Sequence, residues 1–335
     1  MSIQNELSTK LGQLFIVGFP GKAPANAFLQ FIREEQIGGL ILFEENCPTH
    51  EQVRENVERI RDCFNVIPPF IAVDQEGGRI CRLRGAPAEF RAPMSFADSG
   101  DVDLFKEIYS RSAVYMEALG ISLNLAPVAD IWLNNENHCL KDRCFGDSPE
   151  MVAEFVRAAV EVSHASGLIC CLKHFPGLGA ATIDPHEGVS EVDYDRIIWE
   201  QREKLPFEAG IQQGADLLMT THLKAPGFDD TIVTGSHKII SGLARKDLQF
   251  DGPIVTDDLC MEGASVLGSF GERAVAAFNA GHDLLLFGKD TDAAMEAYDY
   301  FADACGRGEV SLDRLRAALD RVAGLRYRLG RSVVR

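Results

Sequence analysis

The stretch from residue 148 to residue 174 reads SPEMVAEFVRAAVEVSHASGLICCLKH and contains a helix pattern followed by a strand pattern. In residues 151–164 the apolar side chains can share one face of a helix, with Ser148 as its N-cap and Pro149 in its first turn. Residues 168–172 are continuously apolar, which is typical of a strand in a parallel sheet that helices cover. The stretch therefore predicts one helix–strand unit of an α/β protein.

This unit recurs along the chain. Eight short apolar runs predict strands at residues 13–18, 39–43, 70–73, 122–126, 168–172, 216–219, 253–255 and 283–287. Helix patterns lie at residues 24–35, 104–119, 151–164, 196–213, 272–280 and 312–329. Eight such units close naturally into a (β/α)₈ TIM barrel. We expect one barrel domain over residues 1–335 with no second domain, and we leave open an irregular strand order or direction at the start of the barrel.

Polar residues follow five of the predicted strands, and this pattern favours a barrel over the competing open, doubly wound sheet. These residues are Asp74 after the third strand, Asp130 after the fourth, Lys173 and His174 after the fifth, His222 after the sixth and Asp257 after the seventh. In a barrel the carboxyl ends of all strands meet at one face, where barrel enzymes have their active sites.

The composition excludes several classes of protein. The 335 residues include 33 Lys plus Arg and 50 Asp plus Glu, and the net charge of -17 repels phosphate backbones, so we expect no nucleic-acid partner. No run approaches the ~18 apolar residues of a membrane span. The start, MSIQNELSTK, lacks the pattern of a secretory signal. Nine cysteines without a CxxC pair are typical of reduced thiols, so we expect a cytoplasmic protein.

Two adjacent acids end the seventh predicted strand. An acid aimed into the mouth of a barrel is a candidate nucleophile or base, although Asp at this position also caps helices. Asp257, which is nearer the strand, is the candidate for the site, and Asp258 is better placed to support the backbone that follows.

The segment after the fifth strand carries further candidates. Lys173 and His174 can donate hydrogen bonds to hydroxyl groups, or they are structural polar groups. In the Gly-rich loop that follows, Asp184 and His186 are two residues apart. A carboxylate fixes the tautomer of a neighbouring imidazole and raises its pKa, so these two residues form a candidate proton-transfer pair.

Two groups of His and Cys residues are candidate metal ligands. They are His138, Cys139 and Cys144 in one loop, and His174, His186 and His222 at the predicted barrel mouth. The first group lacks a second ligand pair at zinc spacing. The second lacks the His-x-His after the first strand that metal-hydrolase barrels usually carry. We therefore expect neither a metal nor a cofactor.

Several motifs together resemble glycoside hydrolase family 3, and within it the single-domain bacterial β-N-acetylhexosaminidases. They are FIAVDQEGGRICRL at 70–83, APVADI from 126, RCFG from 143, KHFPG from 173, MTTH from 219 and TDDLCMEGA from 256. The similarity runs in consistent order from about residue 11 to residue 287, and the family fold is a (β/α)₈ barrel.

The resemblance implies a role for each matching position. It implies that Asp257 is the nucleophile, which forms a covalent glycosyl-enzyme intermediate, and that His186, held by Asp184, is the acid/base. It further implies five positions that bind hydroxyls of the sugar, namely Asp74, Arg82, Arg143, Lys173 and His174. An imidazole can replace the usual second carboxylate because the chemistry needs only a proton donor that later acts as the base.

The chain departs from the family pattern in the loop after KHFPG. The family usually has His-Gly-Asp where this chain has Leu178-Gly179-Ala180, and Asp-Ser-His where this chain has Asp184-Pro185-His186. The first change removes polar anchors of the loop, and Pro185 stiffens it. Both changes bear on the conformation of the loop and on substrate preference, but neither deletes a proposed chemical group.

The sequence therefore predicts a cytoplasmic, cofactor-free, retaining exo-glycosidase whose partner is a carbohydrate. The expected reaction removes terminal β-linked N-acetylglucosamine from oligosaccharides or from muropeptides during cell-wall recycling. One alternative is a β-glucosidase or glycosyl phosphorylase on the same scaffold. A second is a catalytically inactive sugar-binding paralogue, suggested by Leu178 and Ala180.

Overall fold

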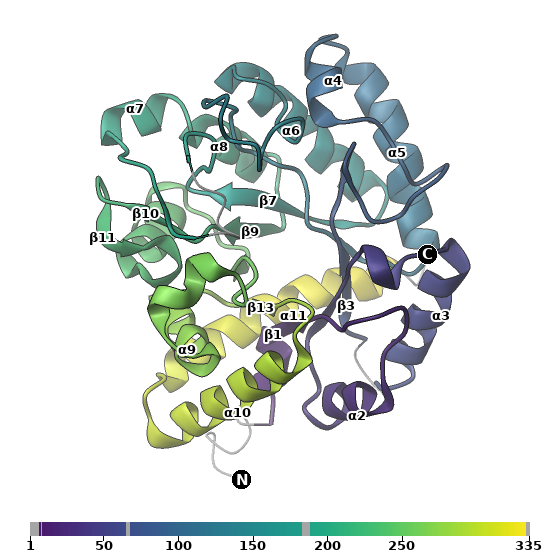
Figure 1. Ribbon diagram of the computed structural model, residues 1–335, viewed down its shortest axis with the longest axis vertical. Coiled ribbons are helices and arrows are strands. Elements are labelled where there is room, and N and C mark those ends of the chain that lie inside the picture. Colours follow the sequence, from purple (N-terminus) through teal and green to yellow (C-terminus); the bar gives the residue numbers. More distant parts are fainter. Residues whose placement is uncertain (1–6, 8, 65–67, 183–187, 333–335) are drawn as a thin grey trace.

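The computed structural model describes residues 7, 9–64, 68–182 and 188–332. Within these ranges, eight parallel strands form one sheet (Figure 1). They are β1 (Phe15–Val17), β2 (Gly39–Leu42), β3 (Phe70–Val73), β6 (Leu123–Asn124), β7 (Ile169–Phe175), β9 (Leu217–Thr220), β12 (Ile254–Val255) and β13 (Leu285–Phe287). The strands are neighbours in chain order, and β13 pairs back onto β1. A parallel bridge from Val255 to Leu284 closes the sheet, so the predicted (β/α)₈ barrel is confirmed.

The irregularity of the sheet lies away from its start. The pairings of β1, β2 and β3 are parallel and in register, whereas the pairing of β7 with β9 shifts between Leu172 and Phe175. The predicted fifth strand ended at residue 172, but β7 runs on to Phe175. Lys173 and His174 can belong to this buried strand because carboxylates compensate their polar groups.

Helices surround the barrel (Figure 1). They are α2 (Asn26–Glu34), α3 (His50–Arg61), α4 (Pro93–Ala97), α5 (Val102–Ala118), α6 (Pro149–Ala165), α7 (Arg196–Gln201), α8 (Lys204–Gln212), α9 (Phe270–Ala280), α10 (Thr291–Arg307) and α11 (Leu312–Ser332). The short helices are η1 (Leu11–Leu14), η2 (Glu44–Asn46), η3 (Val233–Gly235), the π-helix η4 (Lys238–Asp247) and η5 (Glu262–Leu267). None of the described helices is long and apolar enough to cross a membrane.

Local signals explain where individual helices begin and end. The Ser148 side chain accepts a hydrogen bond from the Met151 amide, so the predicted N-cap of α6 is confirmed. The helix predicted over residues 196–213 is instead two helices. The backbone of Arg202 leaves the helical region (φ −131°, ψ −83°), and this break separates α7 from α8.

Additional short strands lie at the carboxyl-terminal end of the barrel. β4 (Gln75–Gly77) and β5 (Ile80–Cys81) form an antiparallel pair directly after β3. β8 (Ser190–Glu191), β10 (Leu223–Ala225) and β11 (Asp229–Ile232) form a separate sheet. These segments lie at the same end of the barrel as the candidate site residues that follow the strands.

Helix α11 covers the opposite end of the barrel. Arg328 pairs with Asp216 at 2.7 Å, and Arg314 pairs with Asp283 at 3.0 Å. Asp216 immediately precedes β9 and Asp283 lies two residues before β13, so both acids mark the amino-terminal end of the barrel. Barrel enzymes have their active sites at the other, carboxyl-terminal end of the strands.

Candidate active site

A pocket of about 220 Å³ lies at the carboxyl ends of the strands. Its lining includes every described residue to which the sequence assigned a site role: Asp74, Arg82, Arg143, Lys173, His174 and Asp257. The predicted pair Asp184 and His186 lies outside the described residues. The barrel therefore gathers into one site residues from strand β7, from the segments that follow β3, β5 and β12, and from the loop after β6.

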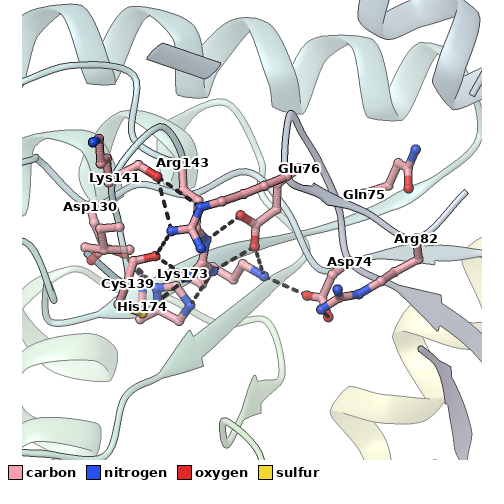
Figure 2. A network of polar contacts seen from close by, with 12 residues as sticks. Asp74, Gln75, Glu76, Arg82, Asp130, Cys139, Lys141, Arg143, Lys173 and His174 are labelled. Carbon is pink, nitrogen blue, oxygen red and sulfur yellow. Dashed lines mark hydrogen bonds and ion pairs between the residues drawn. The ribbon is translucent and has the colours of Figure 1, made fainter. Parts of the chain in front are cut away.

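Lys173 lies at the centre of the polar network in this pocket (Figure 2). Its Nζ is 2.7 Å from Asp74 Oδ1 and 2.6 Å from Glu76 Oε1, and its side chain is 3% exposed. Burial opposes the charge, but the two carboxylates outweigh it and raise the pKa of Lys173. Arg82 is 3.7 Å from the other oxygen of Asp74. Asp74, whose side chain is 15% exposed, thus pairs with both cations.

Glu76 was not predicted, although it belongs to the quoted motif at residues 70–83. Its Oε2 accepts from Arg143 Nε at 2.7 Å, and its Oε1 accepts from Arg143 Nη2 at 2.8 Å, which is a bidentate pair. Burial opposes its charge, but Arg143 and Lys173 hold the pKa of the Glu76 carboxyl well below its ordinary value. Its sequence signal was its place two residues after Asp74, on the same side of the extended chain.

Asp130 is a second carboxylate whose role the sequence did not reveal. Its Oδ2 accepts from His174 Nδ1 at 2.6 Å and from the His174 amide at 3.1 Å. Its Oδ1 accepts from the Leu178 amide at 2.6 Å. Because Nδ1 donates to Asp130, the Nε2 atom of His174 faces Arg143, whose Nη2 is 3.5 Å away. The same carboxylate thus orients a pocket imidazole and anchors the start of the loop after β7.

Asp257 and Asp258 both line the pocket, and their carboxylates accept from different backbone amides. The Oδ1 of Asp257 accepts from the Asp258 amide at 2.8 Å, and Asp257 lines the pocket. Asp258 Oδ1 accepts from the amides of Cys260 at 2.9 Å and Gly288 at 2.8 Å. The predicted backbone-supporting role of Asp258 is therefore confirmed. Burial raises the pKa of its carboxyl.

His222 does not line the pocket with His174. It is fully buried, with Nδ1 2.6 Å from Thr234 Oγ1 and Nε2 3.0 Å from the Asp258 carbonyl oxygen. Burial lowers its pKa, so it is held as a neutral hydrogen-bonding residue. The hypothesis that His222 faces the barrel mouth as a metal ligand is not supported by this environment.

A His, Cys and Asp cluster lies at the other end of the barrel. His164, Cys170 and Asp216 are the side chains in the described ranges that come close enough to share a metal ion. His164 Nε2 is 3.1 Å from Asp216 Oδ2, to which the Cys170 amide also donates. Hydrogen bonds and the pair with Arg328 account for this acid, which lies far from the pocket residues.

Comparisons with known proteins agree with this architecture. Residues 6–325 match the family described as Glycosyl hydrolase family 3 N terminal domain. The chain is 30% identical over 331 residues to Beta-hexosaminidase A of Pseudoalteromonas piscicida, a match that covers 90% of this chain and 55% of that protein. It is 32% identical over 292 residues to Beta-hexosaminidase of Haemophilus influenzae, covering 85% of this chain and 82% of that protein.

A solved structure shares the whole fold. The glycoside hydrolase family 3 beta-N-acetylglucosaminidase from Paenibacillus sp. str. FPU-7 superposes with a TM-score of 0.92 at 32% identity. The match covers 97% of this chain and 62% of that one. The chain therefore spans 55–62% of the Pseudoalteromonas and Paenibacillus proteins, but most of the Haemophilus protein.

Proposed function

The chain belongs to glycosyl hydrolase family 3, and from this premise we propose that it is a retaining exo-glycosidase that removes terminal β-linked N-acetylglucosamine. The resemblance predicted from the motifs is confirmed by these matches. The observation that carries the proposal is the pocket in which Asp257 lies with Asp74, Arg143, Lys173 and His174. Because the charges of these residues compensate one another, the side chains can stay charged in the pocket and still offer hydrogen-bond donors and acceptors to sugar hydroxyls.

In the proposed first step, a carboxylate oxygen of Asp257 attacks the anomeric carbon of the sugar. The bond from that carbon to the leaving oxygen breaks, and the leaving oxygen takes a proton from His186, which Asp184 orients. In the second step, His186 takes a proton from water, the water oxygen attacks the anomeric carbon, and Asp257 is released. Two inversions retain the configuration of the sugar.

We propose that Asp74, Arg82, Arg143, Lys173 and His174 bind the sugar in the subsite next to Asp257. The hexosaminidase relatives support N-acetylglucosamine as the sugar. A cytoplasmic location, with muropeptides from cell-wall recycling as the substrate, is the physiological role that we propose.

An activity panel tests this function. The protein should hydrolyse an aryl β-N-acetylglucosaminide faster than the aryl β-glucoside, with a rate that phosphate does not increase. Asp257→Ala should lower turnover by several orders of magnitude without unfolding the protein, and a 2-fluoro substrate should label Asp257 in the wild type. Phosphate-dependent product would indicate a phosphorylase, and binding of N-acetylglucosamine without turnover would indicate an inactive paralogue. Label on Asp258 or Asp74 would refute the assignment of the nucleophile.

A further inference from the structure

We propose that Glu76 is a positioning residue whose negative charge holds Arg143 and Lys173 in the orientation that binds the sugar. The kinetic part of this inference rests on the proposed function, whereas its structural part does not. Glu76 lies in the wall of the pocket but does not need to touch the substrate, because its side chain is 1% exposed and its two oxygens already accept from Arg143 and Lys173.

The backbone around Glu76 leaves its carboxylate little freedom. The preceding side chain, Gln75, donates to the carbonyls of Leu83 and Ala88 at 3.1 and 2.9 Å and accepts from the Leu83 amide at 3.0 Å. The following residue, Gly77, has φ of 101°, and a Cβ there would lie 2.6 Å from the Arg91 carbonyl oxygen. The backbone of Glu76 is thus fixed from both sides, so its carboxylate can hold the longer side chains of Arg143 and Lys173 in place.

The positive charges around Glu76 make its carboxylate necessary. The pocket is lined by the cations of Arg79, Arg82, Arg143 and Lys173, and Asp74 is the acid that pairs with both Arg82 and Lys173. Figure 2 draws bonds from Arg143 to Glu76 and none from Arg143 to Asp74. Without the Glu76 charge, Arg143 and Lys173 would repel each other in a buried setting.

Glu76→Gln isolates this role because it preserves the shape of the side chain and changes one acceptor into a donor. All three bonds to Glu76 come from charged N–H donors, so at least one of these donors must then face the NH₂ group of the glutamine. We expect Arg143 or Lys173 to move, and a displacement of about 1 Å in a binding group lowers kcat/KM on the order of 100-fold. Glu76→Asp keeps the charge but shortens the side chain, so its kcat/KM should lie between those of the Gln variant and the wild type.

The matched control is Glu89→Gln. Glu89 is 41% exposed, pairs with Arg84 at 3.2 Å, and does not line the pocket, so this substitution should leave kcat/KM unchanged. A second readout is a double-mutant cycle. If Glu76 acts through its partners, the losses in kcat/KM from Glu76→Gln and from Arg143→Met should be much less than additive.

Crystal structures and kinetics decide the proposal together. In the structure of the Glu76→Gln variant, the Arg143 guanidinium or the Lys173 ammonium should occupy a new position. If both remained in place and kcat/KM were unchanged, or if the two losses were fully additive, Glu76 would not be a positioning residue. If the Gln variant did not fold, the Asp variant would be measured in the same way, with a smaller loss expected. A wild type without turnover would refute the proposed function, and the crystal structures would still decide the role of Glu76.

Discussion

Asp130→Asn should impair the pocket although Asp130 is not itself one of the proposed sugar-binding residues, because it holds His174, which is one of them. Asp130 is 1% exposed and accepts three hydrogen bonds, two from His174 and one from the Leu178 amide. An asparagine has one carbonyl oxygen, so its amide group must replace one of the two acceptors.

Each orientation of the new amide has a definite cost. If the amide faces Leu178, the anchor of the loop after β7 is lost. If it faces His174, the imidazole must change its tautomer and point Nε2–H toward Arg143, which lies 3.5 Å from that atom. A hydrogen bond to a charged group contributes about 1.5–3 kcal/mol, and an unpaired buried donor costs about 1–3 kcal/mol. We therefore expect a loss of roughly 2–4 kcal/mol in the free energy of unfolding.

The assay combines urea unfolding with kinetics on an aryl β-N-acetylglucosaminide. The same change at Asp101, the exposed N-cap of α5 whose side chain accepts from the Leu104 amide at 2.9 Å, is the control and should cost about 1 kcal/mol or less without affecting kcat/KM. We expect kcat/KM of the Asp130 variant to fall on the order of 100-fold, because misplaced binding groups lose about that factor. An Asp130 variant with wild-type stability and wild-type kcat/KM would refute the reasoning.

Three further outcomes follow from the site and the fold. His186→Ala should slow a natural disaccharide far more than an activated aryl glycoside, because only the natural leaving oxygen needs protonation; equal losses measured on both substrates would assign the acid to another group. Gly179→Ala should destabilise the protein by roughly 1–3 kcal/mol in urea unfolding, since its Cβ would lie 1.6 Å from the Ile131 carbonyl oxygen. Burial lowers the pKa of His282 to about 3, and its Nε2 accepts from Thr220. The stability that neutral His282 contributes is present above pH 6.5 and is lost as the pH falls toward 3. Between pH 7 and pH 5 the free energy of unfolding of the wild type should therefore fall by roughly 2 kcal/mol more than that of His282→Gln. Urea-unfolding measurements in which both proteins lose the same stability would contradict this.

The sequence predicted the elements of the fold well because the signals for them are local. Continuous apolar runs marked all eight strands of the barrel, and residues 70–73 coincide with β3. Ser148 was identified as a cap because capping involves residues only three apart. The predicted end of β7 was wrong, because polar residues usually end a buried strand. Nothing local in the sequence shows that carboxylates will compensate the charge of Lys173.

The sequence by itself determined the barrel, its family and the residues that gather at the carboxyl ends of the strands. Only the tertiary structure decided which of these residues pair, because the partners are far apart in the chain. Lys173 is 99 residues from Asp74, Arg143 is 67 from Glu76, and His174 is 44 from Asp130. Local periodicity determines which face of a strand a side chain occupies, but not which charge lies opposite it after the barrel closes. The roles of Glu76 and Asp130 depend on these contacts between residues far apart in the chain, and for that reason they emerged only from the folded chain.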